Sequence, residues 1–173
     1  MTSSRLDPHN LAFIVVAVSA LSATLSGCRR TTADQCGVSG AAVVVVVRDH
    51  SMWLCDQGHA LASYRVALGR GGSGKTTAGD AKTPLGTYAL GLPRPSARFG
   101  TFIPVAYPTP EQRRQGFTGT DIGIHGPDRS LQWAGRMNSW FDWTAGCIAL
   151  ATDAEVQQIA TFVRERGPKL LVQ

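Results

Sequence analysis

The stretch Ala42-Val43-Val44-Val45-Val46-Val47 is the most strongly patterned apolar segment of the chain. Its β-branched residues favour a strand. Successive strand side chains point to opposite faces, so an unbroken apolar run predicts a strand that is buried on both faces. The polar residues Arg48 to Ser51 end the run. We therefore predict a central strand of a sheet in a domain that spans residues 41–173.

Further short apolar segments follow, separated by turns. Met52 to Cys55, a turn at Asp56-Gln57-Gly58, and Ala60 to Leu68 predict the next two strands of a meander. Additional strands are predicted at residues 87–90, 101–105, 121–124, 147–150 and 169–172. Gly- and Pro-rich connections separate them, which predicts a mainly β domain.

One helix is predicted over about residues 152–166. Thr152 and Glu155 have the spacing of a capping box, and Gly167-Pro168 ends the segment. Apolar residues recur at helical spacing between them, namely Val156, Ile159, Ala160 and Val163. This apolar stripe should pack on the sheet.

The first 27 residues have the composition of an export signal. Arg5 precedes an apolar run from Leu11 to Val18, which gives way to small residues. The segment Leu11 to Leu25 is short for a bilayer-spanning helix, which needs ~20 apolar residues, although an uncleaved anchor stays open as an alternative. An exported protein is therefore predicted.

Leu25-Ser26-Gly27-Cys28 resembles the bacterial lipobox, in which the signal is cut before the cysteine and lipid is attached to its thiol. Cys28 would then anchor the protein to a membrane, with residues 28–40 as the lipidated N-terminus and tether. Arg29, in place of Asp, resembles outer-membrane sorting if the cell is Gram-negative. The expected location is the periplasmic face of the envelope.

The chain has four cysteines. If Cys28 carries lipid and Cys147 is a nucleophile, Cys36 and Cys55 most simply pair with each other in an oxidising compartment. On composition alone, Cys147 could equally be disulfide-bonded or a buried apolar thiol.

Composition and charge narrow the class of protein. The 173 residues suit one globular domain, which we expect to be monomeric, and the net charge is +5. The basic residues are scattered, with no Lys/Arg block among aromatics, so we predict no nucleic-acid partner. The charge suits an anionic membrane or wall polymer, although ordinary solubility explains it as well.

Gly69 to Thr76 matches the phosphate-binding P-loop pattern and follows a predicted strand. That loop requires a helix directly after its Lys-Thr pair, whose N-terminal amides hold the phosphates. The following residues, 77–86, contain two glycines and a proline, which a helix does not tolerate. We therefore predict no nucleotide partner and a flexible loop bordering a cleft.

Cys147 and His125 are the candidate catalytic pair. A thiol of ordinary pKa needs a neighbouring base to become a nucleophile, and the other histidines lie in the signal or in predicted turns. Thr144 places a hydroxyl three residues before the thiol. The backbone amides of Gly146, Cys147 and Ala145 are predicted to form an oxyanion hole.

These segments resemble a known family. His125-Gly126 with Thr144-x-Gly146-Cys147-Ile148, together with the upstream stretch Gly79 to Tyr88, resembles the L,D-transpeptidase (YkuD-type) catalytic domain from about Ala42 to Val172. The variant Asp-Trp-Thr-x-Gly-Cys-Ile-Ala-Leu is similar to its murein transpeptidase and endopeptidase-like branch.

The resemblance implies a β-sandwich whose cleft holds Cys147 as nucleophile, His125 as base and Thr144 as a supporting hydroxyl. It implies no metal and no cofactor. The implied substrate is the stem peptide of peptidoglycan. The thiolate would attack the carbonyl of the third, diamino residue, expel the terminal D-alanine, and pass the acyl group to an amine of another stem.

Two departures from the family pattern bear on the substrate. The interval between His125 and Thr144 is slightly long, which predicts an enlarged loop, Gly126 to Trp143, acting as a lid over the cleft. Ala149 stands where the family often has Arg or Asn, so acceptor choice cannot be carried over. Candidate substrate-binding residues are Gly126, Arg129, Arg136, Trp143, Thr83 and Tyr88. Alternatively, the tryptophans of the loop simply pack it against the sandwich.

Two other functions stay open. Transfer to water shares every step up to the thioester, so an endopeptidase or carboxypeptidase-type hydrolase is the main alternative. A wall-binding module with a dead site is a third hypothesis, which the presence of both His125 and Thr144 disfavours.

Overall fold

The computed structural model describes residues 35–173. The predicted signal, the lipidation of Cys28 and most of the tether lie outside the described residues. Within residues 35–173, no helix has the length and apolar composition needed to cross a bilayer.

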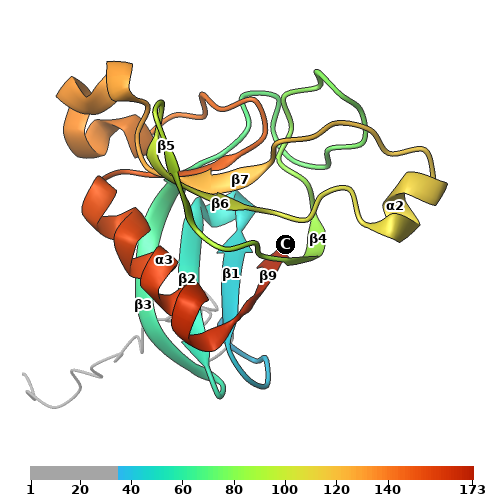
Figure 1. Ribbon diagram of the computed structural model, residues 1–173, viewed down its shortest axis with the longest axis horizontal. Helices are drawn as coiled ribbons and strands as arrows, with labels where there is room; N and C mark the ends of the chain where they lie inside the picture. Colours follow the sequence, from blue (N-terminus) through green and yellow to red (C-terminus); the bar gives the residue numbers. More distant parts are fainter. Residues whose placement is uncertain (1–34) are drawn as a thin grey trace, which may run out of the picture.

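Nine strands form one continuous sheet in the order β4-β9-β1-β2-β3-β8-β7-β6-β5 (Figure 1). The strands are β1 (Ala42–Val46), β2 (Ser51–Asp56), β3 (His59–Ala67), β4 (Gly86–Ala89), β5 (Arg94–Ser96), β6 (Gly100–Pro104), β7 (Gly123–His125), β8 (Ile148–Leu150) and β9 (Lys169–Val172). Neighbours are antiparallel except for two parallel pairs, β1 with β9 and β7 with β8. The helices are η1 (Val47–Asp49), α2 (Pro110–Arg114), η2 (Arg129–Ser139) and α3 (Asp153–Arg166).

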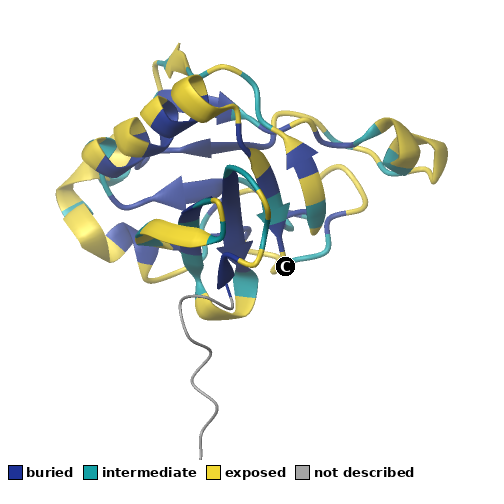
Figure 2. Ribbon diagram, turned by 90° about the horizontal axis from the view of Figure 1, so that it is seen from below, coloured by how far each residue is buried: buried dark blue, intermediate teal, exposed yellow. Residues whose placement is uncertain are grey.

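The sheet curls, so that both of its halves contribute side chains to one core. Val43 from β1, Ile124 from β7 and Ile159 from α3 belong to the same buried cluster. Figure 2 shows buried residues along the inner strands and one side of the helix. The predicted mainly β fold with one helix packed on it is confirmed.

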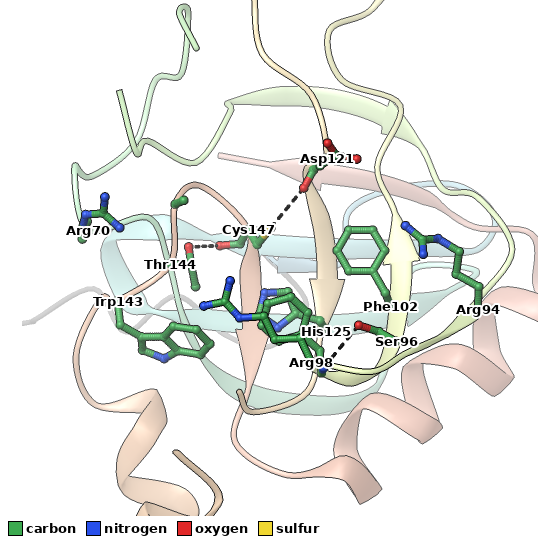
Figure 3. Close-up of a pocket in the computed structure, with 12 residues that line it drawn as sticks. Arg70, Arg94, Ser96, Arg98, Phe102, Asp121, His125, Trp143, Thr144 and Cys147 are labelled. Carbon is green, nitrogen blue, oxygen red and sulfur yellow. Dashed lines mark hydrogen bonds between the residues drawn. The ribbon is translucent and has the colours of Figure 1, made fainter. Parts of the chain in front are cut away.

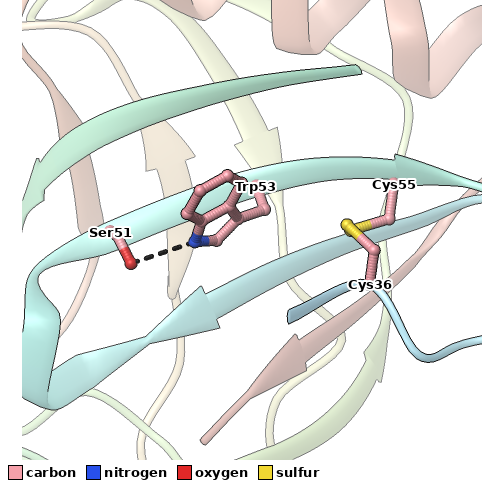
Figure 4. Close-up of a disulfide and its surroundings, with 4 residues drawn as sticks. All are labelled: Cys36, Ser51, Trp53 and Cys55. Carbon is pink, nitrogen blue, oxygen red and sulfur yellow. Dashed lines mark hydrogen bonds between the residues drawn. A yellow bond between two sulfur atoms is a disulfide. The ribbon is translucent and has the colours of Figure 1, made fainter. Parts of the chain in front are cut away.

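Strand β1 is buried along its whole length, as its sequence predicts. Val43 and Val45 enter the main core, whereas Val44 and Val46 face a second, smaller cluster on the other side of the sheet. Cys36 and Cys55 belong to that second cluster and are joined by a disulfide with a Cα–Cα distance of 5.4 Å (Figure 4). Cys36 therefore packs residues 35–40, the described part of the predicted tether, against the outer face of the sheet.

Several elements are not predicted from the sequence. β5 contains Pro95, and α2 is one short turn that begins at Pro110, so neither has an apolar period. α2 did carry a local signal, because Thr109 and Gln112 form a capping box. β7 starts at Gly123 rather than 121, since Asp121 has φ of 58°, which is incompatible with a strand.

The P-loop-like segment has no helix after it, as predicted. Residues 77–85 form turns and bridges that lead into β4. The Lys75 side chain is 3% exposed, and its Nζ lies 2.7 Å from the Asp80 carboxylate. A lysine that is buried in an internal ion pair is not available to hold a phosphate.

Helix α3 follows its predicted capping pattern. The Thr152 hydroxyl accepts a hydrogen bond from the Glu155 amide, and the Glu155 carboxylate accepts from the amides of Ala151 and Thr152. Gly167 closes the helix with φ of 55°, in the left-handed region that favours glycine. These bonds satisfy backbone donors that the first turn leaves unpaired.

We expect Thr152→Ala to lower the free energy of unfolding by about 1 kcal/mol, because it removes the helix cap. Thr161→Ala is a matched control, since Thr161 is an exposed residue in the same helix and alanine has the higher helix propensity. Urea unfolding of the three proteins measures the difference. Equal stabilities of the two variants would contradict the capping role.

Candidate active site

A pocket of about 460 Å³ opens beside the ends of β7 and β8 (Figure 3). Its lining residues come from five separate parts of the chain, namely Arg70, Arg94, Ser96, Arg98, Phe99, Phe102, Asp121, His125, Trp143, Thr144, Ala145 and Cys147. The predicted nucleophile, base and hydroxyl thus share one pocket with the predicted Ala145 and Trp143.

The parallel pairing of β7 with β8 brings the thiol and the imidazole together. His125 pairs with Ala149, two residues after Cys147. Because alternate strand residues share a face, Cys147 and His125 project on the same side of the sheet. Both line the pocket although 21 residues separate them in the sequence.

The orientation of His125 is fixed by the residue that follows it. Its Nδ1 lies 2.7 Å from the Gly126 carbonyl oxygen. A carbonyl only accepts hydrogen bonds, so Nδ1 carries the proton and donates it. In the neutral ring this leaves the Nε2 lone pair free to accept a proton.

Aromatic rings surround the imidazole. The Phe99 ring stacks on it with a centroid distance of 3.8 Å, Phe102 lies at 6.2 Å and Trp143 at 5.7 Å. His125 is 1% exposed, and this burial lowers its pKa to about 4. The imidazole is therefore uncharged at neutral pH.

Among residues 35–173, Cys36 and Cys55 form a disulfide and the thiol of Cys147 is free. The structure therefore contradicts the alternative that Cys147 is disulfide-bonded. Burial raises the pKa of its thiol, and a backbone hydrogen bond from Gly123 opposes the shift. The Sγ donates weakly to the Asp121 carbonyl oxygen at 3.5 Å. The resting pair is thus a thiol and a neutral imidazole rather than an ion pair.

Thr144 organises the turn that carries the thiol. Its hydroxyl donates to the Cys147 carbonyl oxygen at 2.8 Å and accepts from the Gly146 amide at 3.1 Å. The Gly146 amide, predicted for the oxyanion hole, is therefore engaged within the turn. Ala145 and Cys147 line the pocket, so an oxyanion hole from their amides stays a prediction.

Gly146 has no room for a side chain. Its φ is 127°, and a Cβ would lie 2.6 Å from the Lys82 carbonyl oxygen. The loop that contains Lys82 and Thr83 therefore packs directly against residues 144–147, the turn that carries the thiol, which we call the catalytic turn. Thr83 is fully buried, and its hydroxyl accepts from the Gly69 amide, which lies in the segment that bridges to Thr144.

Most of the predicted substrate-binding residues lie outside the pocket. Thr83 supports the catalytic turn from behind, as described above. Tyr88 is 2% exposed and donates to the Leu85 carbonyl. Gly126 is buried and orients His125 through its carbonyl. These three residues are buried behind the pocket lining, and their contact with a substrate stays a prediction.

Arg129 and Arg136, which are also predicted to bind substrate, form ion pairs with α3 and do not line the pocket. Arg129 pairs with Asp153 at 2.8 Å, and Arg136 pairs with Glu155 at 3.0 Å. Trp143 alone of the predicted substrate-binding residues lines the pocket, and its Nε1 donates to the Asn138 carbonyl.

The loop between β7 and β8 is largely the 3₁₀ segment η2. Trp133 is 81% exposed and Trp140 is 68% exposed, so packing against the sandwich does not explain these two side chains. Contact of the loop with a substrate stays a prediction.

Seven lining residues are not predicted from the sequence, namely Arg70, Arg94, Ser96, Arg98, Phe99, Phe102 and Asp121. Four of them come from β5 and the turn after it. A short strand with a proline and no alternation carries no signal of its own, and its side chains reach the pocket only because β5 pairs with β6. Among residues 35–173, no group of three or more His, Cys, Asp or Glu side chains could hold a metal ion.

Comparison with protein families gives a match over most of the chain. The model of the L,D-transpeptidase catalytic domain matches residues 40–170. Among curated proteins, no sequence matches this chain.

Comparison with solved structures finds similar folds. The helical cell shape determining protein Pgp2 from Campylobacter jejuni superposes with a TM-score of 0.64 and 25% identity, over 78% of this chain and 47% of that one. Bd1075 from Bdellovibrio bacteriovorus has a TM-score of 0.59 and 17% identity, over 79% and 49%. An L,D-transpeptidase from Mycobacterium smegmatis has a TM-score of 0.54 and 14% identity, over 78% and 59%. The chain spans about half the length of the first two.

The buried neutral imidazole predicts a pH-dependent stability. The pKa of His125 is about 4 in the folded protein and 6.5 in the unfolded chain, so the unfolded chain binds more protons between these values. The stabilising contribution is complete above pH 6.5 and is lost as the pH falls toward 4. We expect a decrease of about 2 kcal/mol in the free energy of unfolding between pH 7 and pH 5. His125→Gln should lack this part of the dependence in denaturant titrations; the same slope in both proteins would contradict it.

The Thr144 hydroxyl is expected to stabilise the catalytic turn. Thr144→Val leaves the Gly146 amide and the Cys147 carbonyl without their partner and should cost about 1–3 kcal/mol of stability. Thr144→Ser keeps the hydroxyl and serves as the control. Thermal and urea unfolding report the difference, and a valine variant as stable as the serine variant would show that the two bonds contribute nothing.

Proposed function

Because this chain belongs to the L,D-transpeptidase catalytic domain family, we propose that it modifies peptidoglycan as a cysteine acyltransferase acting on stem peptides. One observation carries the proposal: a free thiol directly before β8 and an imidazole with a free Nε2 on the parallel neighbour β7 line one pocket. This arrangement suits acyl transfer through a thioester.

The first half of the reaction follows from the protonation states. Both groups start neutral, so His125 Nε2 takes the Sγ proton as sulfur attacks the carbonyl carbon of the third, diamino residue. The Gly126 carbonyl, which accepts the Nδ1 hydrogen, stabilises the imidazolium that forms. The amides of Ala145 and Cys147 are proposed to hold the oxyanion. His125 then returns the proton to the departing amine of D-alanine, which leaves a thioester on Cys147.

The second half regenerates the thiol. An amine of another stem attacks the thioester, loses a proton to His125 Nε2, and leaves with the acyl group as a new amide. Sγ recovers a proton from the imidazolium. Water in place of the amine would give hydrolysis by the same steps, so the acceptor alone separates the transferase from the hydrolase.

We further propose that the protein acts at the periplasmic face of the envelope, anchored through lipid on Cys28. The Cys36–Cys55 disulfide supports an oxidising compartment, because such bonds are rare where thiols are kept reduced. The similarity to a cell shape determining protein is in keeping with a role in the wall.

Incubation with tetrapeptide muropeptides, followed by mass spectrometry, tests the proposal. We expect release of D-alanine together with dimers joined through two third-position residues. Release of D-alanine without joining would indicate the hydrolase instead.

Two variants tie the activity to the proposed pair. Cys147→Ala should abolish turnover, and His125→Ala should reduce it by about 10²–10⁴-fold. His59→Ala is the matched control, since His59 is an exposed residue at the start of β3. Activity that survives in Cys147→Ala would refute the mechanism.

A further inference from the structure

The pocket carries more positive charge than its catalytic pair requires. Arg70, Arg94 and Arg98 line it, whereas Asp121 is the single acidic lining residue. His125 is uncharged at neutral pH, as described above. The lining therefore has a net positive charge, which favours an anionic ligand.

Arg98 differs from the other two arginines because it is anchored. Its Nε donates to the Asp128 carboxylate at 2.6 Å, and its guanidinium lies 5.0 Å from the centroid of the Phe99 ring. Asp128 is itself held, because its other carboxylate oxygen accepts from the Ser130 amide and hydroxyl at 2.9 and 2.8 Å. One edge of the guanidinium is thus fixed in place.

The other edge of Arg98 is free to bind a ligand. Within residues 35–173, its Nη1 and Nη2 have no hydrogen-bond partner. The guanidinium presents paired N–H donors that match the two oxygens of a carboxylate. Arg94 stacks over Phe102 at 4.8 Å, but its guanidinium has no anchoring carboxylate among the described residues.

Arg98 also lies close to the reacting groups. The Phe99 ring under its guanidinium stacks on the His125 imidazole, and Figure 3 shows Arg98 beside His125. Burial lowers the pKa of His125 and the charge of Arg98 lowers it further, whereas for Cys147 the charge of Arg98 partly opposes the rise in pKa that burial causes. A group bound by Arg98 would therefore lie near the scissile bond.

We propose that Arg98 is a specificity-determining residue that binds a free carboxylate of the peptide substrate beside the scissile carbonyl, with Asp128 as its positioning residue. This inference rests on the proposed function. Two carboxylates have the required chemistry: that of the terminal residue, and one carried by the side chain of the third, diamino residue. Both would accept the same pair of N–H bonds.

A structural role for Arg98 makes a different prediction. Arg98 contacts the loop between β7 and β8 twice, through Asp128 and through its own carbonyl, which accepts from the Arg129 amide at 2.9 Å. If Arg98 only held this loop in place, its replacement would weaken the binding of every peptide by the same factor. A carboxylate contact weakens only the peptide that has the carboxylate.

The test measures binding in the Cys147→Ala background, where no turnover occurs, by isothermal titration calorimetry. Three synthetic tetrapeptide stems are compared: the free acid, the terminal carboxamide, and the carboxamide at the side chain of the third residue. We expect one of the two amides to bind about 10- to 100-fold more weakly than the free acid. Which amide loses affinity identifies the carboxylate.

Variants of Arg98 complete the cycle. Arg98→Gln should weaken binding of the free acid by the same factor and leave binding of the sensitive amide unchanged. Arg98→Lys keeps the charge but lacks the paired N–H donors of the guanidinium, so its affinity for the free acid should lie between those of the parent protein and Arg98→Gln. Arg113→Gln is the control, an exposed arginine of α2 outside the pocket. Circular dichroism establishes that each variant folds.

Three results would overturn the inference: equal binding of all three peptides, an equal loss for all three in Arg98→Gln, or no binding of the free acid. Failure of the proposed function looks different. In that case the protein with Cys147 intact would turn over none of the peptides, while the preference for the free acid in the binding assay, and its dependence on Arg98, would remain.

Discussion

The parallel pairing of β7 with β8 is the constraint on which the site depends. Two antiparallel strands can be joined by a two-residue turn, but parallel strands require a connection that returns to the starting end of the sheet. Residues 126–147 are that connection. It begins with the carbonyl that orients His125 and ends with the turn that carries Cys147. The long loop between β7 and β8 is thus a consequence of the topology that brings Cys147 and His125 to one pocket.

A second layer holds the catalytic turn from behind. The loop at Lys82 and Thr83 packs on Gly146 so closely that no side chain fits between them, and the Thr83 hydroxyl fixes Gly69. Gly69 in turn bridges to Thr144, whose hydroxyl closes the turn. Residues that precede the thiol by 64 to 78 positions in the sequence therefore support the turn that carries it without lining the pocket.

Local patterns in the sequence predict the parts of this protein that local physics determines. The β-branched run at β1, the capping box of α3 and the Cys147/His125 pair all carry their signal within a few residues. The contacts of charged side chains are not predicted from nearby residues, because their partners come from distant elements. The sequence does not predict that Arg129 and Arg136 pair with acidic residues of α3, or that Arg98 enters the pocket through the pairing of β5 with β6. The function of an arginine depends on which element packs beside it.

The neutral resting state of the thiol has a consequence for oxidative damage. Peroxides and other oxidants attack the thiolate far faster than the thiol, and the products beyond sulfenic acid are not recovered. In the oxidising compartment proposed for this protein, Cys147 would meet the same oxidants as the Cys36–Cys55 pair. A cysteine that loses its proton only while a substrate occupies the pocket gives oxidants little thiolate to attack. In the proposed mechanism, the aromatic burial that keeps His125 uncharged would also preserve Cys147 between turnovers.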